Sequence, residues 1–290
     1  MASDQSSFDV ANLFRVDGLV AVITGGGTGI GLSIAKALAL NGAAKVYIIG
    51  RRLEKLQEAA AASPHGNIIA LQGDVTSKDD LAAIVARITS EVGYINLLVC
   101  NSGIGGPNLL PILHKDTSIA ELKEYIWTNW TQEGFSKTFE VNVTAVFFTA
   151  IAFIELLDLG NKKKNYEDVS SQIIVTSSIA AYLRQVVTGF AYPTSKAAVD
   201  HMSKSLSTYL IPYGIRVNTL NPGSFSTELT EKLIGKVDGF SPESLPGKRL
   251  GNDQDLAGTT LYLCSKAGAY LNGLALVIDG GSLSVRPSSY

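Results

Sequence analysis

The feature that most constrains the fold is the stretch from Gly18 to Gly31, which reads GLVAVITGGGTGIG. It opens with Leu19–Ile23, a short apolar run that is typical of a strand buried on both faces. Five glycines follow within seven residues, and a helical pattern then runs from Ile30 to Leu40. A strand, a glycine-rich turn and a helix N-terminus together form an anion site. Backbone N–H groups and the helix dipole point at one place there, and the absence of a Cβ lets a phosphate approach closely.

The spacing of these glycines departs from the common dinucleotide-binding pattern G-x-G-x-x-G, which fits no register of the loop. What stands there is Thr24-Gly25-x-x-x-Gly29-x-Gly31. Taken alone, such a cluster is also compatible with a tight strand-to-helix turn that binds nothing. The remainder of the chain has to decide between the two interpretations.

Strand and helix patterns alternate along the chain, which predicts an α/β, Rossmann-type doubly wound fold with a parallel sheet of about seven strands flanked by helices. We expect residues 1–290 to form a single domain, with 1–17 as an N-terminal extension. The strands are predicted at Leu19–Ile23, Lys45–Ile49, Asn67–Leu71, Asn96–Cys100, Gln172–Thr176, Ile215–Leu220 and Ala275–Ile278. The longer helices are predicted at Ile30–Leu40, Leu53–Ala62, Asp79–Val92, Thr138–Leu159, Ala191–Leu210 and Asp253–Cys264.

Two segments interrupt this alternation. Residues 104–136 form a long connection with a short helix predicted near 120–127. Residues 228–250 are rich in Gly, Pro and Ser, and their place after a predicted strand favours a substrate lid over a fixed surface excursion.

Composition and charge exclude several classes of function. A net charge of −2 gives no electrostatic case for a nucleic-acid partner. The most apolar stretch, Thr144–Leu159, is too short to span a bilayer, and no secretory signal segment is recognised, so we expect a cytoplasmic protein without a membrane partner. Cys100 and Cys264 lie far apart in apolar segments, which favours free thiols, and the three histidines show no metal-ligand spacing, so no metal site is predicted.

Tyr192 and Lys196, in the segment Tyr-Pro-Thr-Ser-Lys, form a pair that suggests acid–base chemistry. Their i, i+4 spacing places both side chains on one face of a helix. A free tyrosine has a pKa of about 10, and a nearby ammonium favours the phenolate and moves that pKa toward neutral pH. Ser177 and Ser178 follow a predicted strand, at the sheet edge where open α/β folds place ligands.

At this point the sequence resembles the short-chain dehydrogenase/reductase family, over nearly the whole chain. The matching motifs occur in the family's order: Thr24-Gly-Gly-Gly-Thr-Gly-Ile-Gly31, Gly73-Asp74-Val75, Cys100-Asn-Ser-Gly103, Val141-Asn142-Val143, Ser178, Tyr192-x-x-x-Lys196 and Asn221-Pro222-Gly223. Three departures stand out. The family's Asn-Asn-Ala-Gly reads Cys-Asn-Ser-Gly here, the interval from Ser178 to Tyr192 is one residue longer than usual, and the segment between Gly103 and Asn142 is also longer.

The resemblance implies a catalytic role for four residues. Tyr192 would give its proton to a carbonyl oxygen, and Ser178 would hydrogen-bond that oxygen, with Ser177 as the alternative serine. Lys196 would bind the nicotinamide ribose and acidify Tyr192, and Asn142 would hold a water that relays protons to Lys196.

The resemblance also implies a cofactor site that runs from the pyrophosphate and adenine to the nicotinamide end. Its expected residues are Thr24, Gly25, Gly29, Ile30, Gly31, Arg51, Asp74, Val75, Asn101, Gly103, Tyr192, Lys196, Pro222, Gly223 and Thr227.

The residue that follows the second strand indicates which cofactor is used. Members that prefer NAD carry an acid there to bind the ribose 2′-hydroxyl, whereas this chain has Arg51, followed by Arg52. A guanidinium suits a 2′-phosphate, so NADP(H) is favoured over NAD(H), although the glycine loop has Thr28 where some NADP enzymes have a basic residue.

The leading interpretation is an NADPH-dependent oxidoreductase that interconverts a ketone and a secondary alcohol, active as a homodimer or homotetramer. An NAD-dependent alcohol dehydrogenase of the same family and a cofactor-binding regulator without turnover are the alternatives.

Overall fold

The computed structural model describes residues 8–112, 116–166, 168–185, 188–227, 230 and 245–289. Seven parallel strands form one sheet, in the order β3-β2-β1-β4-β5-β6-β7. The strands are β1 (Val20–Thr24), β2 (Lys45–Gly50), β3 (Ile68–Gln72), β4 (Leu97–Cys100), β5 (Gln172–Thr176), β6 (Arg216–Pro222) and β7 (Ala275–Ile278). The predicted Rossmann-type parallel sheet is therefore confirmed, with the strand order reversing between β1 and β4.

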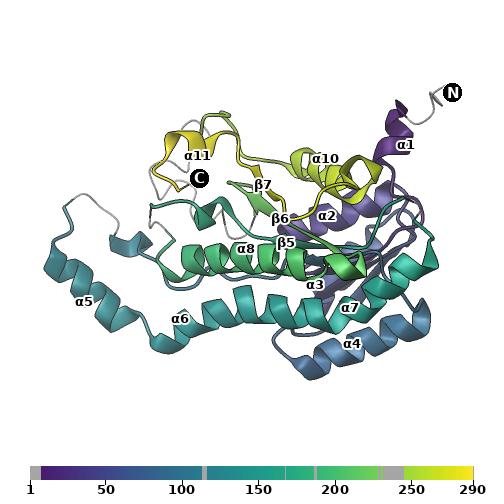
Figure 1. The fold of residues 1–290 in the computed structure, drawn as a ribbon. Helices are drawn as coiled ribbons and strands as arrows, with labels where there is room; N and C mark the ends of the chain where they lie inside the picture. The colour runs from purple at the N-terminus through teal and green to yellow at the C-terminus, as the bar shows by residue number, and fades with distance from the viewer. Residues whose placement is uncertain are drawn as a thin grey trace.

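Helices cover both faces of this sheet (Figure 1). One hydrophobic core joins the strands to α2 (Gly29–Leu40), α3 (Leu53–Ala61) and α10 (Asp253–Cys264). The other core joins them to α4 (Lys78–Glu91), α7 (Ala145–Lys163) and α8 (Ala191–Tyr209). Along β1, Ala21 and Ile23 belong to the first core and Val20 and Val22 to the second. This burial on both sides explains why the strand is a continuous apolar run instead of an alternating one.

The remaining helical elements are mostly shorter. They are α1 (Val10–Phe14), η2 (Leu110–Ile112), α5 (Ile119–Asn129), α6 (Gln132–Phe139), η3 (Glu140–Thr144), η4 (Ile179–Ala181), η5 (Ile211–Tyr213), η7 (Lys266–Gly268) and α11 (Ser282–Val285). α1 lies within the predicted N-terminal extension and is capped by Asp9, whose side chain accepts a hydrogen bond from the Ala11 N–H.

The segment that precedes α7 is more helical than the sequence patterns predict. α6, η3 and α7 form one continuous helix over Gln132–Lys163, so the predicted start at Thr138 is wrong by six residues. The reason is a local cap: the hydroxyl of Thr131 accepts a hydrogen bond from the Gly134 N–H and fixes the first turn. α5 similarly begins with a capping box between Ser118 and Glu121.

This continuous helix also bears on the membrane question. Among the described residues, it is the one helix long and apolar enough to span a bilayer by length and composition, so the argument that the apolar stretch is too short does not hold. Its inner side is buried on the sheet, where Val146, Phe153 and Leu157 join the core with α4 and α8. A core helix of a soluble α/β protein passes the same test, and the packing supports that interpretation.

The packing of α7 on the sheet can be tested at Gly160. A Cβ built there would lie 2.0 Å from the carbonyl oxygen of Ile95, whereas one built at the exposed Gly258 of α10 meets nothing within 4 Å. We expect Gly160→Ala to lower the free energy of unfolding by about 2 kcal/mol or more, because backbone cannot move aside cheaply. The matched control Gly258→Ala should instead raise it by roughly 0.5–1 kcal/mol, through the helix propensity of alanine. Urea unfolding of the two variants and the wild type measures both effects, and equal stabilities for the two variants would contradict this packing.

Candidate active site

The carboxyl ends of the parallel strands open onto a cleft of about 620 Å³. It lies at the edge where β1, β2, β3 and β4 end, next to the reversal of strand order. Nine of the residues predicted to bind a cofactor line it: Gly25, Gly29, Ile30, Arg51, Asp74, Val75, Asn101, Gly103 and Thr227. The fold therefore brings to one place residues that the sequence spreads over about 200 positions.

The glycine loop has the conformation that only glycine adopts without strain. Gly25 and Gly29 have φ angles of +65° and +53°. Gly31 has a different reason to be glycine, because a Cβ there would lie 2.3 Å from the Gly25 carbonyl oxygen. The loop leads into the N-terminus of α2, where the first N–H groups of a helix have no partner within it, and Thr28, Gly29 and Ile30 at this end line the cleft.

Two of the residues predicted to bind a cofactor, Thr24 and Gly31, make contacts that support the loop. The Thr24 hydroxyl accepts hydrogen bonds from the N–H groups of Asn101 and Ser102, at 2.9 and 3.1 Å, and so ties β1 to the end of β4. Neither Thr24 nor Gly31 is among the described residues that line the cleft.

One end of the cleft is lined by basic side chains. Arg51, Arg52 and Lys55 all face it, and the Arg51 guanidinium lies 3.9 Å from the carboxylate of Asp74. Burial would raise the pKa of Asp74, but hydrogen bonds from Thr76 and the charge of Arg51 outweigh it and lower that pKa. The Arg51 side chain is 71% exposed, so it can turn toward a ligand at small cost.

The sequence reasoning missed two cations of this cleft, Lys55 and Lys137. Lys55 follows Arg51 by four residues, in the first turn of α3, and that spacing could have suggested it. Lys137 lies on α6, between the connection expected at 104–136 and the helix predicted from Thr138, and no pattern in the sequence connects it to the cleft.

Tyr192 and Lys196 lie one turn apart on α8, as predicted. The Lys196 Nζ is 5.8 Å from the centre of the Tyr192 ring and donates a 2.7 Å hydrogen bond to the carbonyl oxygen of Thr176, at the end of β5. Lys196 is only 4% exposed, and this burial lowers its pKa to about 8, against a smaller opposing effect from the charge of Asp200.

Ser178 is the serine that meets Tyr192. Its side chain forms a hydrogen bond with Tyr192 and also accepts one from the Ala180 N–H at 3.1 Å. The Ser177 hydroxyl is buried and donates to the Lys196 carbonyl oxygen at 3.2 Å, so it secures α8 to the strand end instead.

The expected acidification of Tyr192 is not what the structure shows. Burial raises the pKa of Tyr192 above its ordinary value, and the hydrogen bond with Ser178 lowers it by less. The phenol is therefore held protonated in this structure, as a proton donor should be.

Asn142 joins this group through a turn of π-helix. The long helix has a turn of π-helix, η3, at residues 140–144, and such turns occur often at functional sites. The Asn142 amide spans the Ile104 backbone, accepting from its N–H at 2.9 Å and donating to its carbonyl at 3.0 Å, and it also donates to the Ser195 hydroxyl. A Cβ at Gly103 would lie 3.2 Å from Asn142 Oδ1 and 3.6 Å from Lys196 Nζ, so the cleft and the Tyr192–Lys196 pair meet there.

The end of β6 supplies the remaining predicted residues. Gly223 donates its N–H to the Ile278 carbonyl, and a Cβ there would lie 2.7 Å from the Asp279 backbone, so it packs tightly beside β7. Pro222 and Gly223 are not among the described residues lining the 620 Å³ cleft, whereas Thr227 reaches it beside Gly29.

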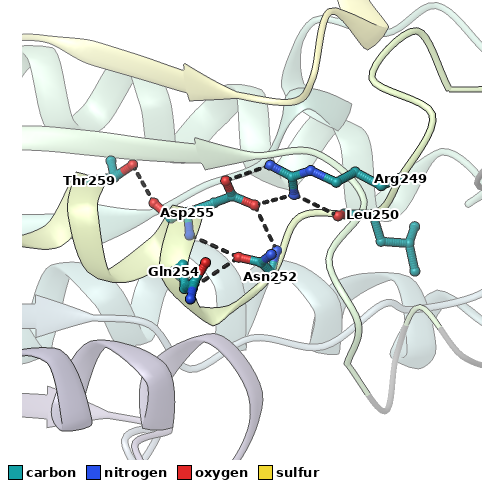
Figure 2. Close-up of polar contacts among 6 residues, drawn as sticks. All are labelled: Arg249, Leu250, Asn252, Gln254, Asp255 and Thr259. Carbon is teal, nitrogen blue, oxygen red and sulfur yellow. Dashed lines mark hydrogen bonds and ion pairs between the residues drawn. The ribbon is translucent and has the colours of Figure 1, made fainter.

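Most of the proposed lid at 228–250 lies outside the described residues, which resume at 245. The end that is described is held to α10 (Figure 2). Arg249 donates to both carboxylate oxygens of Asp255, one of them at 2.8 Å, while Asn252 caps the helix by accepting from the N–H groups of Gln254 and Asp255. Within the described part of the chain, no group of three or more His, Cys, Asp or Glu side chains could hold a metal ion.

Comparisons with known proteins agree with this fold. The family model for short chain dehydrogenase matches residues 19–237. A short-chain dehydrogenase/reductase, PhomF from Diaporthe leptostromiformis, is 52% identical over 290 residues and covers 98% of each chain. Among solved structures, the RhlG/NADP active-site complex of Pseudomonas aeruginosa superposes with a TM-score of 0.79 at 26% identity, over 93% of this chain and 98% of that one. A 7 alpha-hydroxysteroid dehydrogenase complexed with NADH and 7-oxo glycochenodeoxycholic acid gives a TM-score of 0.78 at 27% identity, over 95% and 98%.

The burial of Lys196 predicts a pH-dependent stability. Its pKa is about 8 in the folded protein and 10.5 ordinarily, so between these values the unfolded chain binds more protons and stability rises with pH. The free energy of unfolding of the wild type, relative to that of Lys196→Met, should therefore rise between pH 8 and 10 by up to about 1.4 kcal/mol per pH unit. Urea unfolding at four pH values measures this difference, in which the other titrating groups cancel. A difference that stays flat would mean that Lys196 is solvated.

Proposed function

This chain belongs to the short-chain dehydrogenase/reductase family, and we propose that it is an NADPH-dependent oxidoreductase that interconverts a ketone and a secondary alcohol. The observation that carries the proposal is the convergence at Gly103. There the cleft meets Lys196 and Asn142, Tyr192 lies one turn from Lys196 on α8, and Ser178 acts on Tyr192 from the start of η4, just after β5. We treat residues 1–290 as one cofactor-binding and catalytic domain.

The residues around the cleft fit a nicotinamide dinucleotide. Gly25 and Gly29 leave the backbone open at the N-terminus of α2, which suits a pyrophosphate. Arg51 at the adenosine end suits a 2′-phosphate, and Gly103 at the other end leaves room beside Lys196 for a ribose. When bound, the cofactor supplies the hydride.

The protein's own residues would handle the proton. The phenol of Tyr192 is the acid that gives a proton to the carbonyl oxygen, and the raised pKa keeps that proton available at neutral pH. Ser178 hydrogen-bonds the same oxygen and fixes its place relative to Tyr192. The Lys196 ammonium, held by the Thr176 carbonyl, stabilises the negative charge that remains on Tyr192 after transfer, and Asn142 orders the backbone beside it.

A second candidate is an NAD-dependent alcohol dehydrogenase. The observation that favours it is the contact of Arg51 with Asp74, which partly satisfies the cation that would otherwise bind a 2′-phosphate. The cofactor preference is therefore the part of the proposal with the most direct test.

The role of Tyr192 is tested by Tyr192→Phe. The ring keeps its shape but has no proton to give, so kcat for the preferred ketone should fall by about 10²-fold or more while NADPH binding stays within a factor of about two. Steady-state kinetics and fluorescence titration of NADPH measure the two quantities. Tyr209→Phe, at the exposed end of the same helix, is the matched control and should leave both unchanged. A kcat for Tyr192→Phe above a tenth of the wild-type value would remove Tyr192 from the acid role.

The role of Arg51 is tested by Arg51→Asp, compared with Arg52→Asp. The substitution removes the attraction between the Arg51 guanidinium and the 2′-phosphate of NADPH and adds a repulsion between that phosphate and the new carboxylate. The ratio of kcat/KM values should therefore shift toward NADH by about 10- to 100-fold, which corresponds to roughly 1–3 kcal/mol. Arg52 donates to the Thr28 hydroxyl, so its replacement should shift the ratio less. If kcat/KM falls by the same factor with NADPH and with NADH in Arg51→Asp, this residue does not bind the 2′-phosphate.

A further inference from the structure

The helix face that carries Tyr192 and Lys196 continues for one more turn to Asp200. Asp200 is 5% exposed and Lys196 is 4% exposed, so a carboxylate and an ammonium are both buried there, four residues apart. Burying an ionised carboxylate costs desolvation free energy unless the charge is paired or hydrogen-bonded. The burial of Asp200 therefore needs an explanation.

The position of the Asp200 carboxylate is fixed from β6. Its Oδ2 accepts a 2.8 Å hydrogen bond from the Nδ2 of Asn221, a residue with no exposed surface. Asn221 is itself held, because its Oδ1 accepts from the Thr219 hydroxyl at 2.9 Å. The other carboxylate oxygen, Oδ1, has no hydrogen-bond partner among the described residues.

Among the described groups around Lys196, Asp200 is the one that supplies a negative charge. β5 and η4 present Thr176, Ser177 and Ser178, and η3 presents Asn142, all uncharged at neutral pH. Tyr192 is the other titratable neighbour, and burial keeps it protonated. The charge of Asp200 is the effect that opposes the desolvation of Lys196, and it acts without a direct ion pair between the two side chains.

The hydrogen bond to Asn221 does not by itself require an acid. An asparagine at position 200 could accept the same hydrogen bond through its amide oxygen, without the cost of burying a charge. The charge is what distinguishes aspartate from asparagine at this site, and the nearest buried cation on the same face is Lys196.

We infer that Asp200 is a positioning residue that holds Lys196 in its protonated form and so sets the upper pH limit of the reaction. The inference rests on the role proposed for Lys196 and adds a residue that none of the sequence motifs contains.

The first test is the pH dependence of kcat/KM for ketone reduction in Asp200→Asn. Without the carboxylate, Lys196 should lose its proton more easily, so the decline at high pH should begin about one pH unit lower than in the wild type. Asp158→Asn, which removes a half-buried acid of α7 that pairs with Lys162, is the control for net charge and should leave the profile in place. A purely structural Asp200 predicts a uniform loss of activity at every pH, and an unmoved profile would overturn the inference.

The second test does not depend on turnover. We would measure urea midpoints against pH for the wild type, Asp200→Asn, Lys196→Met and the double variant. The loss caused by Asp200→Asn should be larger with Lys196 present than in the Lys196→Met background at pH 7, and the two losses should converge near pH 10.5, where the lysine is neutral. Additive losses at all pH values would overturn the inference.

The inference stays testable if Asp200→Asn does not fold or if the protein reduces no ketone. If Asp200→Asn does not fold, Asp200→Glu and Asp200→Gln provide a pair of equal size that differs in charge, and the midpoints should separate in the same direction. If the protein reduces no ketone at all, the proposed function fails, while the unfolding cycle still decides whether Asp200 acts on Lys196.

Discussion

The parallel pairing of the seven strands is the constraint on which the rest of the structure depends. Because every strand runs in the same direction, the loops after β1, β2, β3, β4, β5 and β6 all leave from one edge of the sheet. The glycine turn, Arg51, Asp74, Asn101 and Ser178 reach a common region for this reason alone. The reversal of strand order between β1 and β4 then leaves space between adjacent loops, and the 620 Å³ cleft lies there.

Burial determines the chemistry of the site more than direct charge pairing does. Lys196 and Tyr192 lie on a helix that packs against the sheet, so the neutral form of each is favoured, and their pKa values move in opposite directions. The Thr176 carbonyl, which accepts a hydrogen bond from Lys196, and the Ser178 hydroxyl, which acts on Tyr192, offset part of this cost of burying the charged forms. The site that results holds a protonated phenol beside an amine poised near neutral pH, an arrangement suited to giving and regaining one proton.

How much could be predicted from the sequence depends on the range of the interactions involved. The apolar runs predict the strands because burial on two faces leaves a local record, as in β1. The glycine loop and the Tyr192–Lys196 spacing are equally local, and the structure places them where they are expected. The early start of the long helix depends on one cap at Thr131, and the π-helical turn at Asn142 on contacts with Ile104 and Ser195, which lie 38 and 53 residues away in the chain. Lys137 reaches the cleft only through tertiary packing, and the helix spacing places Asp200 on the face of Lys196 without showing its burial or its hydrogen bond from Asn221, which comes from β6.

The central claim is that this site transfers hydride between a nicotinamide and a carbonyl carbon while Tyr192 supplies the proton. The most direct measurement uses NADPH deuterated at C4 of the nicotinamide, on either face in separate reactions, with a panel of ketones. Mass spectrometry of the product alcohols should find deuterium on the carbinol carbon with one of the two labelled cofactors and not with the other. Binding of NADPH without deuterium in any product alcohol would contradict the account, and would identify the chain as a cofactor-binding protein without this chemistry.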